Sequence, residues 1–296
     1  MGFYLVVLAS FAAGAINAVA GGGTFLTFPA LTYFGGLTDL RANVTSTIGL
    51  WPGSASSVVA AWGEFRKLPK GIVILFSIIS LAGGAVGSLL LLHTSPNTFS
   101  LIIPWLLGFA TIVFACSKPI ARWAGRQHGD RSLRWTIIVG VVQMAVAVYG
   151  GYFGAGIGVL MLAGLAFAGL DNIHQMNALK VLLATLINGV SCVIFLFGPV
   201  AWKLAPPMAV ASIIGGFLGM YAARRIRQDQ LRALILAVGI TLTIVYFVKN
   251  YRGGFARHSA RTEIGNNAGI GYNRFVDIPR TNSAFCFGTN RDAGPS

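Results

Sequence analysis

Apolar and polar stretches alternate along the chain as far as about residue 249, and the apolar stretches are long. Ten apolar segments can be distinguished: Tyr4–Ala20, Thr24–Phe34, Asn43–Trp62, Gly71–Leu92, Phe99–Lys118, Trp135–Gly150, Ile157–Leu170, Met176–Phe197, Trp202–Ala223 and Leu231–Val248. A helix needs about 20 apolar residues to cross the hydrocarbon core of a bilayer, because each residue adds only ~1.5 Å. Most segments approach this length, so the pattern predicts an all-α, polytopic membrane protein.

Two of these segments, Thr24–Phe34 and Ile157–Leu170, are too short to span the bilayer. Each follows a glycine-rich break in the apolar pattern, which is Gly21–Gly23 in the first half of the chain and Gly150–Gly158 in the second. A short segment covers only part of the hydrocarbon core. The two segments therefore either form re-entrant helices or extend broken helices that their neighbours begin.

The two breaks belong to an internal repeat. Positions coincide at an offset of 134 residues, and a Gly-Gly-x-x-Gly run recurs at an offset of 132. The matched positions are Gly22 with Gly156, Leu26 with Leu160, Leu31 with Leu165, Gly35 with Gly169, Asn43 with Asn177, Ser57 with Ser191, and Gly83, Gly84 and Gly87 with Gly215, Gly216 and Gly219. We expect two repeats of about five segments, 4–118 and 135–249. If every segment crosses, this odd number inverts the second repeat, and broken helices at matching places are typical of transporters.

Charge is scarce and gathers outside the apolar segments. The chain is 55% hydrophobic and 10% charged, whereas a soluble domain has about 25% charged residues. Its net charge is +14, and basic residues cluster in Glu64–Lys70, Lys118–Arg134 and Arg224–Arg232. Cytoplasmic loops of membrane proteins carry such an excess. We interpret the charge as a topology signal and expect a lipid bilayer, not nucleic acid, as the surrounding partner.

The same three basic stretches favour one topology. If all ten segments cross, the stretches all face the cytoplasm and both ends of the membrane domain face outside. If the two short segments did not cross, Arg224–Arg232 would lie outside, so we expect crossing. The sequence thus predicts a multi-pass protein of the cell (inner) membrane with a transmembrane domain, 1–249. The remainder, 250–296, is rich in Gly, Asn, Ser, Thr and Arg and predicts a disordered polar tail.

Residue types that carry enzyme chemistry or bind metals are few and scattered. The three Cys and four His residues show no CxxC or Cys/His spacing. There are no paired carboxylates and no Ser/His/Asp arrangement. The glycine runs do not match the dinucleotide fingerprint, which joins a strand to a helix in a soluble unit. We expect no enzyme activity, no cofactor and no metal site.

Lys180 is the exception to the absence of ionisable residues at membrane depth. It lies several residues into the eighth apolar segment. Because a cation inside a membrane is energetically costly, its presence there indicates a functional residue. The alternative is that its side chain reaches the near interface, because Asp171 is only about two turns away.

The breaks supply a second element of an anion site. Where a helix begins inside the membrane, its first N–H groups have no partner within the helix and carry the positive end of the dipole. Glycine lets the backbone approach a ligand closely. The alternative, close helix packing, suits the Gly-Gly-x-x-Gly runs better. Neutral polar groups near the breaks could bond an oxyanion. The candidate site residues are Asn17, Gly21, Gly22, Gly23, Asn43, Thr45, Ser46, Gly154, Gly156, Gly158, Asn177 and Lys180.

Several motifs resemble those of one family in order along the chain. Ala15 to Gly23 followed by Pro29-Ala30-Leu31, and Arg41 to Ser46, resemble the first repeat of the TauE/SafE sulfite exporter family. Phe153 to Gly158 and Met176 to Lys180 resemble its second repeat, although Ala163 stands where a second proline would match Pro29. The resemblance covers about residues 1–250. It implies a permease that exports sulfite, an organosulfonate or a related small anion. The alternative function is a membrane scaffold or assembly factor without transport.

Overall fold

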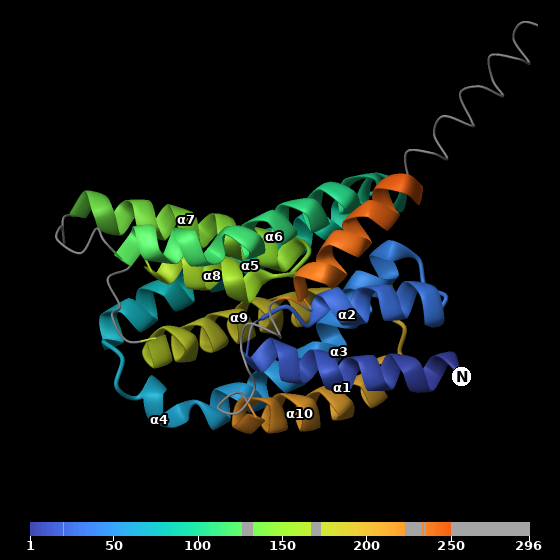
Figure 1. Ribbon diagram of the computed structural model, residues 1–296, viewed down its shortest axis with the longest axis horizontal. Helices are drawn as coiled ribbons and strands as arrows, with labels where there is room; N and C mark the ends of the chain where they lie inside the picture. The colour runs from blue at the N-terminus through green and yellow to red at the C-terminus, as the bar shows by residue number, and fades with distance from the viewer. Residues whose placement is uncertain (20, 126–132, 167–172, 223–232, 234, 250–296) are drawn as a thin grey trace, which may run out of the picture. The chain divides into compact units, whose positions relative to one another are not determined.

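A computed structural model describes residues 1–19, 21–125, 133–166, 173–222, 233 and 235–249 (Figure 1). Within these ranges the regular elements are helices. They are α1 (Gly2–Val19), α2 (Thr24–Pro29), η1 (Ala30–Phe34), α3 (Asp39–Ala60), α4 (Trp62–Phe65), α5 (Lys70–His93), α6 (Pro96–Gly125), α7 (Leu133–Tyr152), α8 (Ile157–Ala166), α9 (Ile173–Phe195) and α10 (Ala205–Ala222). A further helix, Ile235–Lys249, follows α10. The predicted tail, 250–296, lies outside the described residues.

The helices have the length and composition of membrane-spanning elements. Of the described helices, Lys70–His93, Pro96–Cys116 and Gln175–Phe195 are long and apolar enough to cross a membrane, and several shorter helices are also apolar. Large apolar side chains cover their outward faces, among them Ile112 and Phe217. Such a surface is unfavourable in water and suits lipid. The all-helical membrane class predicted from the sequence is therefore confirmed.

The first short segment doubles back along the helix that precedes it. A Cβ atom added to Gly2 would collide with the carbonyl oxygen of Phe34, and one added to Gly23 would crowd that of Ala13. The end of η1 thus lies beside the start of α1, and the two segments form an antiparallel hairpin. Pro29 has no N–H to donate, and the chain widens directly after it into the π-helical turn η1.

The second short segment repeats this arrangement. A Cβ atom on Gly150 in α7 would collide with the side chain of Ile157 at the start of α8. About two turns further along α8, Gly164 lies against Val142, which is about two turns earlier in α7. Helix α8 therefore runs antiparallel to α7. Within the described residues, α8 has 10 residues against 20 in α7, and the 6 residues of α2 with the 5 of η1 face the 18 of α1, so that neither short segment runs the full length of its predecessor. Our expectation of complete crossings is corrected accordingly. A helix that doubles back reverses the chain as a crossing does, so the charge argument could not distinguish the two.

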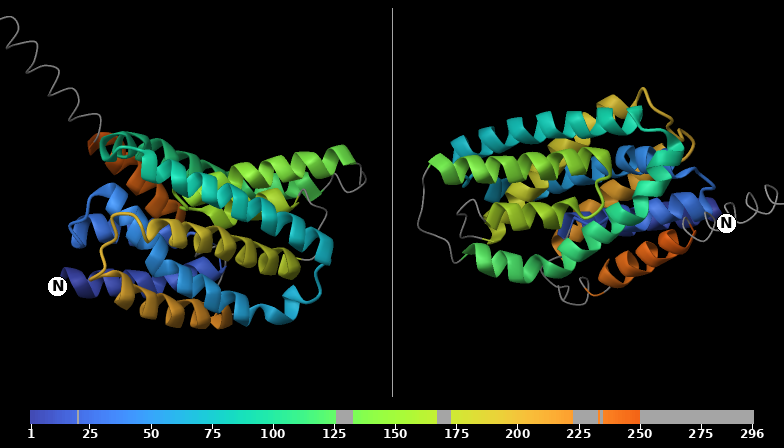
Figure 2. Two further views of the ribbon diagram at one scale, coloured as in Figure 1. Left: turned by 180° about the vertical axis from the view of Figure 1, so that it is seen from behind. Right: turned by 90° about the horizontal axis from the view of Figure 1, so that it is seen from above.

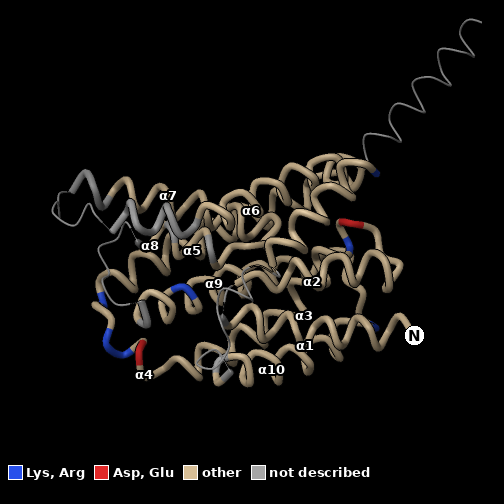
Figure 3. Tube along the Cα trace, viewed as in Figure 1, with Lys and Arg blue, Asp and Glu red and all other residues tan. Residues whose placement is uncertain are grey.

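The helices that precede the three basic stretches all start at one end of the helix bundle. The hydroxyl of Ser100 near the start of α6 donates to Asp39 at the start of α3. The N–H of Ala201, just before α10, donates to Thr45 in the same part of α3. Helices α3, α6 and α10 therefore lead away from this common end. The basic loops 126–132 and 223–232 that follow two of them lie outside the described residues. Figure 3 shows described charges mainly at helix ends, with one basic position inside α9.

The packing of the long helices depends on the two Gly-Gly-x-x-Gly runs. In α5, Gly83 contacts Ala147 of α7 and Gly87 contacts the backbone of Val148. In α10, Gly215 and Gly219 lie equally close to the backbone of α1, and Gly216 lies close to that of α3. Helix α1 therefore lies along α10, as α5 lies along α7 (Figure 2). Small residues allow such close backbone approach. The packing role expected for these glycines is confirmed.

The arrangement of the helices predicts the accessibility of the loops. Single cysteines introduced at Lys67, Arg126 and Arg225 should all react with a membrane-impermeant maleimide from the cytoplasmic side, because each follows a helix that leads away from the same end. A cysteine at Asn97 should react from the opposite side. Labelling of Arg225 together with Asn97 would contradict this topology.

Candidate functional site

The two glycine breaks, which are far apart in the sequence, meet directly. The N–H of Gly158 donates to the carbonyl oxygen of Gly21 over 3.4 Å. A Cβ atom on Gly21 would collide with the Cα atom of Gly158. The predicted glycines of both breaks are buried. The structure therefore brings Gly21, Gly22 and Gly23 together with Gly154, Gly156 and Gly158 in one place, which we call the break junction.

Left-handed glycines produce both breaks. Gly21 has a φ of 74°, and its N–H donates to the carbonyls of Ile16 and Asn17, which ends α1. Gly154 has a φ of 75° and its N–H donates to Tyr149, which ends α7 in the same way. Gly156 is also left-handed. The chain then starts a new helix in each case, so the N-terminal ends of α2 and α8 both lie at the break junction.

Asn17 holds the first break against α3. Its side-chain oxygen accepts the N–H of Gly23 over 3.3 Å, and its amide group donates to the Ser54 hydroxyl over 3.2 Å. The Ser46 hydroxyl lies 2.6 Å from that of Thr27 in α2. Thr45, by contrast, accepts the N–H of Ala201 over 3.0 Å. Ser46 of α3 therefore faces the first hairpin and Asn17 of that hairpin bonds back to α3, whereas Thr45 secures the connection between α9 and α10.

Asn43 connects α3 to the second break. Its amide nitrogen donates to the carbonyl of Tyr152 at the end of α7 over 3.0 Å. The side chain is only 1% exposed, and its oxygen has no hydrogen-bond partner among the described residues. Asn177, at the matching position of α9, is half-buried. The structure thus places Asn43 beside the break junction through a contact that sequence spacing alone did not reveal.

Lys180 is buried inside α9, and its residue is 1% exposed. It lies about two turns from Ile173, where α9 begins. Burial argues against a side chain that extends into water at the interface. The acidic residues that the structure describes, Asp39 and Glu64, lie in first helical turns. Within the described ranges, no three His, Cys, Asp or Glu side chains gather as a metal site would require.

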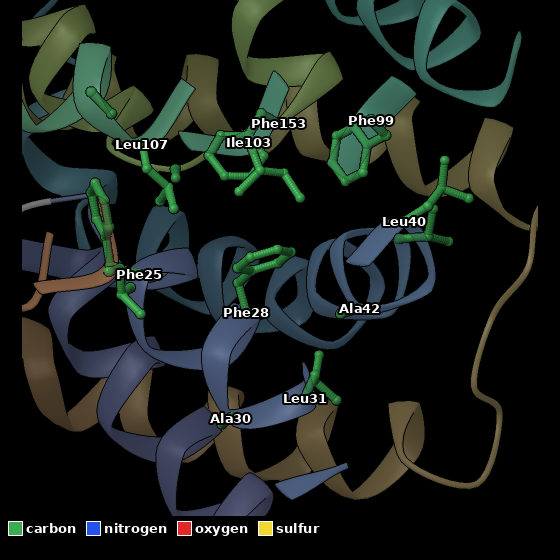
Figure 4. Close-up of a cluster of buried hydrophobic side chains, with 14 of the residues drawn as sticks. Phe25, Phe28, Ala30, Leu31, Leu40, Ala42, Phe99, Ile103, Leu107 and Phe153 are labelled. Carbon is green, nitrogen blue, oxygen red and sulfur yellow. The ribbon is translucent and has the colours of Figure 1, made fainter. Parts of the chain in front are cut away.

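Aromatic side chains fill the space between the break junction and the common starting end of α3, α6 and α10 (Figure 4). The ring of Phe153, within the second break, lies 5.7 Å from that of Phe28 in α2 and 6.3 Å from that of Phe99 in α6. Phe28 also lies 5.7 Å from Tyr246. Sequence reasoning missed this aromatic layer. The only indication of this layer in the sequence was the presence of one phenylalanine near each break, Phe28 after the first and Phe153 within the second.

Asp39 ties the outer edge of the aromatic layer together. Its carboxylate accepts the Ser100 hydroxyl over 2.7 Å and the Tyr246 hydroxyl over 3.2 Å. The Tyr246 hydroxyl also lies 3.3 Å from that of Thr32 in η1. The carboxylate therefore links α3, α6 and helix Ile235–Lys249, and the Tyr246 hydroxyl extends this network to the first hairpin. The sequence showed Asp39 only as an acid near a loop.

The structure also has an apolar groove of about 640 Å³ that none of the predicted site residues lines. It runs between α3, α5, α9 and α10, and Trp51, Leu81, Val190 and Pro206 are among its lining residues. The indole N–H of Trp51 donates to the carbonyl of Thr185 over 3.1 Å and is thereby satisfied. Such a surface offers an anion no charge and few donors. The groove is therefore separate from the candidate site.

Apolar helices, broken pairs that double back and a buried junction of helix starts define an α-helical, multi-pass membrane protein. The chain belongs to the sulfite exporter TauE/SafE family, whose pattern it matches over residues 6–246. This confirms the resemblance read from the motifs, and it identifies the chain as a member of a family of membrane transporters, not enzymes.

Similar proteins of known sequence carry general names. The chain is 27% identical to "Probable membrane transporter protein ORF9" of Sinorhizobium sp, over 80% of this chain and 89% of that protein. It is 26% identical to "Probable membrane transporter protein" of Haemophilus influenzae, over 79% and 89%, and 26% identical to "Probable membrane transporter protein YfcA" of Escherichia coli K12, over 81% and 86%. No solved structure matches the chain significantly.

The contact between the breaks predicts unequal effects of two alanine substitutions. Gly21 and Gly36 both have a positive φ, but only a Cβ on Gly21 meets another backbone, whereas one on Gly36 meets nothing within 4 Å. Gly36→Ala should lower the free energy of unfolding by about 1 kcal/mol, from backbone strain alone. Gly21→Ala should cost about 1–3 kcal/mol more, from overpacking. Thermal denaturation of the purified protein in detergent measures both, and equal losses would contradict the contact.

Proposed function

We propose that the chain is a permease that exports a small anion, such as sulfite or an organosulfonate, through a site at the break junction. The observation that carries this proposal is the contact between Gly21 and Gly158, because it brings two helix starts from separate halves of the chain to one buried point. Helix starts of this kind bind anionic groups in transporters with discontinuous helices. The family name points to the same class of substrate.

The proposal includes two inverted repeats, and the helix contacts support it. In the internal repeat, α1 corresponds to α7 and α5 corresponds to α10. Helix α1 packs along α10, and α7 packs along α5 in the same way. The glycine contacts match as well. Gly216 packs on Gly53 in α3, while Gly84 packs on Ile187 in α9, and Ile187 is related to Gly53 by the offset of 134 residues. Because each hairpin is followed by three long helices, the second hairpin enters from the opposite end of the bundle.

Lys180 supplies the full charge in this proposal. Its counterpart at the offset of 134 residues is Ser46, which lies against Thr27 in α2. By the same relation we expect Lys180 to lie beside α8, and the contact between α8 and α9 supports this. Each helix start acts as about half an elementary charge. Two helix starts and one lysine together suit a small anion that has lost part of its water shell.

The aromatic layer closes one side of the proposed site. Phe28 and Phe153 belong to the two hairpins, and Tyr246 fixes the layer to Asp39. An anion at the break junction is therefore separated from the end at which α3 begins. Movement of the hairpins against the other helices would open this side and close the other, as alternating access requires.

The proposal predicts loss of transport when the charge of Lys180 is removed. Lys180→Met keeps most of the side-chain volume, so the protein should still insert and purify. Removing one buried charge of an ion contact costs about 2–5 kcal/mol, so sulfite efflux from loaded proteoliposomes should fall at least about tenfold. Lys203→Met, at an exposed position before α10, is the matched control and should keep normal efflux.

Normal efflux by Lys180→Met would remove this residue from the site. Absence of flux for any small sulfur anion in the unaltered protein would instead favour a membrane scaffold.

A further inference from the structure

The oxygen of the Asn43 side chain has an unusual environment. A carbonyl oxygen can only accept hydrogen bonds, so the group of Asn43 that lies 3.0 Å from the Tyr152 carbonyl must be the amide nitrogen. This contact fixes the orientation of the amide group, so that its oxygen points away from the Tyr152 carbonyl. Among the buried side-chain atoms that the structure describes, only this oxygen and the Thr111 hydroxyl lack a hydrogen-bond partner. Buried acceptors without a donor are rare and costly.

This acceptor lies where α3 meets both hairpins. Tyr152 ends α7 and directly precedes the second break. One helical turn after Asn43, Ser46 contacts Thr27 in α2, so the same face of α3 reaches the first hairpin. The Asn43 oxygen is therefore a hydrogen-bond acceptor at the border of the break junction.

We propose that Asn43 selects the transported anion by accepting a hydrogen bond from it. The inference rests on the proposed function and narrows its substrate class. The substrate is an oxyanion that carries its own O–H or N–H donor, such as a singly protonated inorganic oxyanion or a sulfonate with a hydroxyl group. An anion that presents only oxygen lone pairs or methyl groups leaves the Asn43 oxygen unsatisfied. Sites with such a polar group discriminate strongly against ligands that lack the matching donor.

The test compares two anions that differ by one hydroxyl group. Ethanesulfonate and 2-hydroxyethanesulfonate both carry a single negative charge, and only the second offers a donor. Dissociation constants are measured with the purified full-length protein, from the rise of the melting temperature with anion concentration. The unaltered protein should bind 2-hydroxyethanesulfonate at least about tenfold more tightly, which corresponds to one hydrogen bond to a buried acceptor.

Two variants separate selection from a general effect on folding. In Asn43→Leu the ratio of the two dissociation constants should fall to about one. In Gln143→Leu, a control at another buried amide, which donates to Ser80 between α7 and α5 and lies outside the candidate site, the ratio should stay close to that of the unaltered protein. The comparison of the two anions on the unaltered protein needs no variant, so it carries the test even where Asn43→Leu does not fold.

Each outcome bears on a different claim. Equal binding of the two anions to the unaltered protein would overturn the selection by Asn43, leave the anion site intact, and mean that water satisfies the oxygen. A preference that persists in Asn43→Leu would also overturn it. Binding of neither anion would overturn the anion site itself, and this inference with it.

Discussion

The structure depends on the close backbone contact between Gly21 and Gly158. In a membrane every backbone polar group needs a partner within the protein, and here one break supplies a partner for the other through the N–H of Gly158. A side chain at Gly21 would occupy the space of the second backbone. The hairpin α1–α2 can therefore lie this close to the hairpin α7–α8 only because residue 21 is a glycine. This contact brings the starts of α2 and α8 together.

Much of the fold could be predicted from the pattern of apolar segments and glycines. The long helices, the two breaks and the packing role of Gly83 and Gly87 follow from segment length and from the need for small residues at close contacts. The return of Thr24–Phe34 along α1 could not be predicted, because apolar length does not determine direction. A doubled-back helix and a crossing helix leave the basic loops on the same side. Charge therefore could not separate them.

The candidate site shows the same limit. Sequence reasoning selected neutral polar residues near the breaks, but it could not tell which of them the fold already uses. Asn17 is bonded to Gly23 and Ser54, and Thr45 to Ala201, so both hold the chain in place. The amide nitrogen of Asn43 donates to the Tyr152 carbonyl, and its side-chain oxygen has no hydrogen-bond partner among the described residues. These distinctions depend on contacts between residues far apart in the sequence, and so do the links from Asp39 to Ser100 and Tyr246.

The central claim is that a small anion binds at the break junction. Crystals of the protein grown with selenite, an analogue of sulfite whose selenium scatters anomalously, test it most directly. We expect an anomalous peak within about 4 Å of backbone N–H groups at the start of α2 or α8, because selenium lies one bond beyond the oxygen that accepts the hydrogen bond. The peak should lie between the two breaks and on the side of Lys180. A peak confined to exposed basic residues such as Lys203, in crystals of protein that transports the anion, would contradict the account.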